Sequence, residues 1–290
     1  MHKFLRAIGF SDITKKDLEM ILDEVITRPE IMKITKDSEG NEFAELSGSF
    51  AANAGITVRG TYQEDDSFHM DYYYPYVFGT SITTNEQIDV EKHAEKESYA
   101  GVCDEVNLGV TLIFYIQNVA DYLAETNRHL SQIHYGAMLA GLSTEGKILC
   151  PVVERKKNDV PAIQKNDRHN QLIAQAREGD EDAIESLTLE DMDTYALLFQ
   201  RVMKEDIFSI VKSTFMPFGI ESDQYTVLGE IIDCVTMENK LTHEKLYGMK
   251  LLCNNIQFDV CINEKDLLGE PAIGRRFRGN VWMQGNLCLE

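Results

Sequence analysis

The sequence has no closely spaced cysteine pair. Its six cysteines are scattered along 290 residues without a Cys-x-x-Cys motif, and none of the seven histidines lies within four residues of a cysteine. A structural zinc site needs such ligands at short spacing, and a chain of this length does not need disulfides to compensate for a small core. We therefore interpret the cysteines as reduced core residues and expect no metal site.

Nucleotide-binding loops and long apolar runs are also missing. No glycine-rich loop leads into Lys-Ser or Lys-Thr, no Gly-x-Gly-x-x-Gly follows a predicted strand, and we therefore expect no cofactor. The longest apolar run, residues 108–116, is far shorter than the roughly 20 residues that span a bilayer as a helix. Residues 1–10 lack the apolar core of a secretion signal, so we expect a cytoplasmic protein.

Positive charge is scarce. The chain has 48 acidic and 28 basic residues, and its formal net charge is −20. A field of this sign repels nucleic-acid phosphates and anionic lipid surfaces. We expect no nucleic-acid partner and no membrane partner, and a homodimer is a candidate assembly.

Apolar periodicity predicts an α+β fold with antiparallel sheets in the N- and C-terminal parts and a helical segment between them. Residues 14–27 carry a capping box and a helical apolar face, and residues 43–50, 56–62 and 68–78 alternate as in an antiparallel meander. A further helix is predicted around residues 118–126. The last predicted strands are 225–237, 256–262 and 278–289.

Composition divides the chain into three parts. Residues 1–153 are expected to form an α+β unit with the meander, and residues 154–170, polar and locally basic around a proline, to form a linker or exposed loop. Residues 171–290 are expected to form a helical segment, ending with a helix over 206–215, followed by a second α+β unit. Two short segments complete the expectation: a hairpin turn at 144–147 and a short helix within 239–250.

The two strand-rich parts share one pattern. Val110, Leu112, Phe114 and Ile116 occupy alternate positions of one predicted strand, and they match Ile256, Phe258, Val260 and Ile262 in the other. A duplicated α+β unit is therefore one interpretation, and chance alternation is the other. The sequence leaves open whether both parts contribute to one sheet.

An aromatic ladder marks the strand at 68–78. Its alternation places Tyr72, Tyr74 and Tyr76 on one face. Large aromatic side chains dominate ordinary cores, and the same ladder is also compatible with a ligand groove.

A basic segment stands out against the acidic background. Arg275, Arg276 and Arg278 lie close to Trp282, the single tryptophan. Guanidinium groups bind carboxylates and phosphates through paired hydrogen bonds, which indicates an anion site or a contact with an acidic partner. The alternative is that these arginines pair with the surplus acidic residues of the chain itself.

Three stretches carry a family resemblance: the opening Met-His-Lys-Phe-Leu-Arg-Ala-Ile-Gly-Phe at 1–10, Phe-Met-Pro-Phe-Gly-Ile-Glu-Ser-Asp at 215–223, and Gly-Arg-Arg-Phe-Arg-Gly at 274–279. With them the chain resembles a family of anaerobic Gram-positive bacteria catalogued as domain of unknown function 3881. The resemblance extends over essentially the full length. It implies no activity, ligand or catalytic residue.

Two hypotheses about function follow. In the first, the protein is a non-catalytic cytosolic binding or regulatory protein that uses the aromatic face or the arginine segment as its contact surface. In the second, it is an enzyme acting on a small anionic metabolite, with Arg275, Arg276 or Arg278 orienting the substrate.

Overall fold

The computed structural model describes residues 1–92, 96–128, 134–152, 211–219 and 223–289. By contacts the chain divides into two compact units, one made of Met1–Cys150 with Ser213–Glu290 and the other of Pro151–Lys212. The linker expected at 154–170 and most of the predicted helical segment lie outside the described residues. The first unit is described below.

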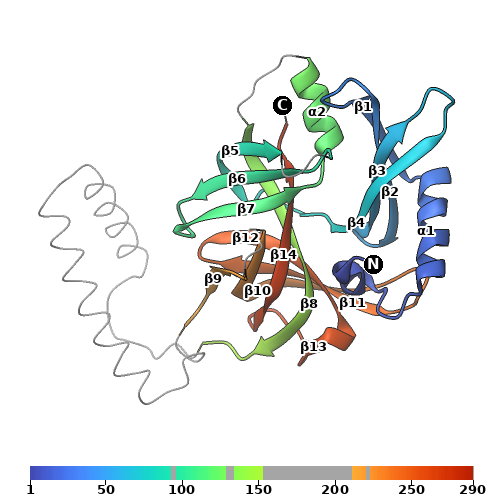
Figure 1. Cartoon of the computed structure of the whole chain (residues 1–290). Helices are drawn as coiled ribbons and strands as arrows, with labels where there is room; N and C mark the ends of the chain where they lie inside the picture. Colours follow the sequence, from blue (N-terminus) through green and yellow to red (C-terminus); the bar gives the residue numbers. More distant parts are fainter. Residues whose placement is uncertain (93–95, 129–133, 153–210, 220–222, 290) are drawn as a thin grey trace, which may run out of the picture. The chain divides into compact units, whose positions relative to one another are not determined.

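The N-terminal part forms a four-stranded antiparallel sheet in the order β1-β2-β3-β4 (Figure 1). Its strands are β1 (Ile31–Lys36), β2 (Glu42–Ala51), β3 (Ala54–Tyr62) and β4 (Phe68–Val77). The last three confirm the predicted meander. The edge strand β1 is not predicted from the sequence. Its residues are all exposed or half-exposed, and they show no alternation of apolar and polar residues.

Helix α1 (Lys15–Thr27) covers this sheet. The side chain of Thr14 accepts a hydrogen bond from the Asp17 backbone N–H (3.2 Å), which caps the helix as the sequence predicts. Val25 on its buried face lies so close to Gly48 of β2 that a Cβ there would be 2.8 Å from the valine methyl. Glycine at this point therefore permits the close approach of helix and sheet.

The remaining strands form one ten-stranded sheet. Its first group is β5 (Thr84–Lys92), β6 (Tyr99–Glu105), β7 (Val110–Ile116), helix α2 (Val119–Asn127) and β8 (His134–Leu149). Its second group is β9 (Thr214–Pro217), β10 (Gln224–Glu238), β11 (Lys245–Cys253), β12 (Ile256–Asn263), the 3-10 turn η2 (Glu264–Asp266), β13 (Leu267–Leu268) and β14 (Arg276–Leu287).

Pairing closes this sheet on itself twice. Strands β8 and β14 run antiparallel side by side through its middle (Figure 1). Strands β10, β11 and β12 close a ring through β14 and β8, and β5, β6 and β7 close a second ring through the same two strands. Closure removes exposed sheet edges from most of these strands.

The two rings repeat one topology. In each group, three consecutive antiparallel strands are followed by a fourth that returns beside the first: β8 beside β5, and β14 beside β10. This is the Greek-key order 4-1-2-3. Helix α2 precedes the fourth strand in the first group, whereas the short turn η2 and the two-residue strand β13 stand there in the second. What repeats is therefore the strand order rather than an α+β unit.

The sheets are mostly antiparallel, as expected, but the fold is β-rich rather than clearly α+β. Three segments account for the difference. Residues 245–253 form β11 where a short helix is expected, and Phe215, the end of the last predicted helix, lies in β9. Residues 144–147 continue β8 without a turn, because Gly146 packs against the Phe277 ring, which a Cβ would meet at 2.4 Å.

The strand-rich parts on both sides of residues 151–212 share the large sheet, which answers the question that the sequence leaves open. The physical reason is β8, which pairs near its start with β5 and along its length with β12 and β14. The linker boundaries themselves stay a prediction.

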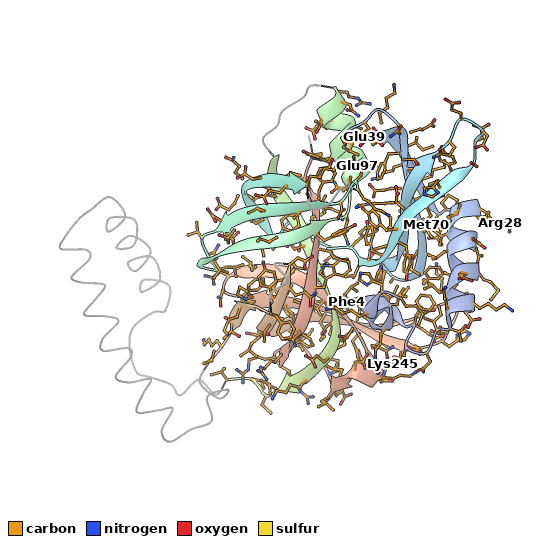
Figure 2. All side chains as sticks on the ribbon, viewed as in Figure 1. Phe4, Arg28, Glu39, Met70, Glu97 and Lys245 are labelled. Atoms are coloured by element: carbon orange, nitrogen blue, oxygen red, sulfur yellow. The ribbon has the colours of Figure 1, made fainter. Side chains whose placement is uncertain are left out.

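Two hydrophobic cores stabilise the unit. The first fills the rings with residues such as Phe114, Phe258 and Phe277. The second lies between the four-stranded sheet and the large sheet, and the N-terminal 3-10 helix η1 (Lys3–Ile8) inserts into it; Phe4 lies where η1 meets β14 (Figure 2). Among the described residues, no helix is long and apolar enough to cross a membrane.

Candidate functional site

The predicted basic residues lie at the start of β14. Arg276, Arg278 and Trp282 occupy alternate positions of the strand and therefore share one face, while Arg275 precedes the strand. That face is covered along its C-terminal half, where Gln284 is fully buried, and is less buried around Arg278.

Trp282 belongs to the covered half. Its side chain is 6 % exposed, its ring stacks on Phe4 with centroids 5.3 Å apart, and His2 lies 4.9 Å away on the same centroid measure. The indole Nε1 donates to Asp223 Oδ2 at 2.7 Å. The structure thus places Trp282 in the second core.

The side chains of Arg275 and Arg276 donate hydrogen bonds to backbone carbonyls. Arg275 is exposed, and its Nη1 donates to the Glu270 carbonyl (2.6 Å). Arg276 is 5 % exposed and its Nε donates to the Cys150 carbonyl (2.9 Å). Burial lowers the pKa of Arg276 from its ordinary value. These two side chains order the segment before β14 and the end of β8.

Arg278 lines a cavity of about 390 Å³, within the usual size range of ligand pockets. In the β8–β14 register Arg278 lies directly opposite Lys147, so both cationic side chains project from the same face of the sheet. We call this cavity the Arg278 pocket. It is lined by Glu145, Gly146, Lys147, Phe218, Thr226, Leu268, Arg278, Gly279 and Asn280.

A chain of hydrogen bonds fixes the polar floor of the Arg278 pocket. Thr226 Oγ1 on β10 donates to Asn280 Oδ1 at 2.7 Å, and Asn280 Nδ2 donates to Glu145 Oε1 on β8. These hydrogen bonds fix the orientation of the Asn280 amide, and they engage one carboxylate oxygen of Glu145. The pocket therefore combines two cations, one carboxylate and a preorganised amide on two neighbouring strands, β8 and β14, and Thr226 comes from β10.

The predicted aromatic face is closed. Tyr74 and Tyr76 are buried, Tyr72 is half-buried, and Tyr76 stacks on Phe78 with ring centroids 4.3 Å apart. The hydroxyls of Tyr72 and Tyr74 turn toward a group that the sequence analysis missed, the guanidinium of Arg59 on β3.

Arg59 is fully buried, with 0 % exposure, and it gathers three tyrosines. Nη1 donates to the hydroxyls of Tyr72 (2.9 Å) and Tyr115 (2.8 Å). Nη2 donates to the hydroxyl of Tyr74 (3.1 Å). The three rings also lie within 6 Å of the guanidinium carbon, close enough for cation–π attraction.

The same guanidinium links the two sheets. Nη2 donates to the carbonyls of Ile116 (3.1 Å) and Gln117 (2.8 Å) at the end of β7, and lies 3.5 Å from Glu45 Oε1 on β2. The other oxygen of Glu45 accepts from the Ala120 backbone N–H in the first turn of α2. Burial raises the pKa of Glu45. We call Arg59, Glu45 and the three tyrosines the Arg59 cluster.

A cavity of about 50 Å³ adjoins the Arg59 cluster. This volume is far below the roughly 300–1,000 Å³ of most ligand pockets. The Arg59 cluster is therefore a buried linkage between sheets. Its sequence signal was the β3–β4 hairpin register, which sets Arg59 opposite Tyr72 in the aromatic ladder.

Other candidate chemistry is sparse. Among the described residues, no group of three or more His, Cys, Asp or Glu side chains has an arrangement that could hold a metal ion. Burial raises the pKa of the Cys103, Cys253 and Cys261 thiols to about 12, which disfavours their nucleophilic thiolate forms.

Comparison with known proteins identifies a family and no relative of known activity. The model of a family described as "Domain of unknown function, E. rectale Gene description (DUF3881)" matches residues 5–285. No curated protein and no solved structure matches the chain. Since the match covers nearly all of the sequence, the chain belongs to the family of domain of unknown function 3881.

Proposed function

We propose that this protein is a non-catalytic binding protein that takes a small anionic ligand in the Arg278 pocket. The observation that carries the proposal is the position of Lys147 and Arg278, which face each other on adjacent strands at the wall of a 390 Å³ cavity. A guanidinium and an ammonium that project from one face of adjacent strands can contact one anion together.

The side chains around the pocket fit an anion chemically. A guanidinium presents up to five N–H donors in a planar fork that matches a carboxylate, and an ammonium adds a mobile point charge. The amide of Asn280 is held in place by Thr226 and Glu145, so its contribution needs no reorganisation on binding.

The lining favours binding over turnover. Glu145 is its single carboxylate, and one oxygen of that group accepts from Asn280. The described lining residues include no histidine, the residue most often used in general acid–base catalysis, and no carboxyl group besides Glu145.

The test is a calorimetric titration of the full-length protein with phenylacetate as the anion probe. Arg278→Gln and Lys147→Gln remove one cation each from the pocket. Arg28→Gln, an exposed residue at the end of α1, removes the same charge elsewhere. We expect the pocket variants to bind at least about tenfold more weakly, since one charge-assisted hydrogen bond contributes about 1.5–3 kcal/mol.

The control also separates local from long-range electrostatics. Because the net charge is −20, every lost cation deepens the negative field, and Arg28→Gln measures that general effect. No binding by the wild type, or equal loss in Arg28→Gln and Arg278→Gln, would contradict the proposal.

A further inference from the structure

We draw no further inference here: the strongest candidate, the exposed apolar side chains of Met32 and Ile34 on the edge strand β1, carries none, because nothing in the described part of the structure shows what covers them.

Discussion

Arg59 and Arg278 are both arginines on β-strands of one unit, and their surroundings are opposite. Arg59 lies in a closed cluster where three hydroxyls, two carbonyls and Glu45 surround its guanidinium. Arg278 lies at the wall of an open cavity beside a second cation. We therefore assign Arg59 to the fold, and we propose that Arg278, which lies at a cavity wall opposite Lys147, contacts a ligand.

The contrast continues along β14 itself. One face of the strand bears Trp282 and Gln284 under the four-stranded sheet and η1, and the same face bears Arg278 beside the pocket. The covered half is a structural interface, and the open half is a candidate site. The following variants test this division in order of decreasing expected effect on stability.

Replacement of Arg59 should have the largest effect. Arg59→Met keeps a similar volume but leaves the Glu45 carboxylate buried without its cation, and loss of one partner of a buried pair costs about 3–5 kcal/mol. The free energy of unfolding, measured by urea denaturation, should fall by that amount.

The double variant Arg59→Met with Glu45→Gln supplies the control. Because the second change removes the uncompensated charge, the combined loss should be smaller than the sum of the single losses by at least about 1 kcal/mol. Additive losses, or a loss below 1 kcal/mol in Arg59→Met, would show that the cluster does not link the sheets as described.

Acid should next weaken the covered half of β14 through His2. Burial, with a smaller contribution from Lys3, lowers the pKa of His2 to about 4 from 6.5. The unfolded state then binds the proton first, so the stabilisation is complete above pH 6.5 and is lost as the pH falls toward 4.

The dependence of the unfolding free energy on pH should be shallower in His2→Phe over that window, with a difference of at most about 1.4 kcal/mol per pH unit. The phenyl ring preserves the contacts with Phe4 and Trp282. Parallel pH profiles of the wild type and His2→Phe would contradict burial of a neutral His2.

Arg276 should show a moderate effect. Arg276→Gln removes the hydrogen bond to the Cys150 carbonyl, and loss of one such bond costs about 1 kcal/mol. The unfolding midpoint in urea should shift accordingly, while phenylacetate affinity changes less than twofold. A large loss of affinity would place Arg276 in the site together with Arg278.

Arg278 should matter least for stability and most for binding. Arg278→Gln should destabilise the protein less than Arg59→Met does, because the Arg278 side chain is only partly buried, and it should weaken phenylacetate binding at least about tenfold. A destabilisation comparable to that of Arg59→Met would assign Arg278 a structural role and remove the distinction between the two arginines.

Sequence patterns identified the local elements well where one face is buried. Helix α1 and strands β2 to β4 follow from capping and alternation, and the match between 110–116 and 256–262 points to two strands that hold equivalent places, each third in its Greek key. The patterns could not show that β8 pairs with β5, β12, β13 and β14, because those partners are distant in sequence.

The candidate site was predictable only in part. The basic residues near 275–278 identified Arg278. Its neighbour Lys147 lies in a segment that the sequence predicts as a turn, because Gly146 is compatible with a turn as well as with a close contact with Phe277. Arg59 has no basic neighbour in the sequence, so no pattern predicts it as a site residue. Trp282 is a predicted site residue because it is the single tryptophan of the sequence, and that fact does not indicate whether its side chain is buried.

The most direct test of the account is a crystal structure of the protein grown with phenylacetate at ten times its measured Kd. The account predicts the carboxylate in contact with Lys147 and Arg278, and an unchanged Arg59 cluster. Phenylacetate bound beside Arg59, or at a place away from the Arg278 pocket, would contradict the assignment of one arginine to the fold and the other to the ligand.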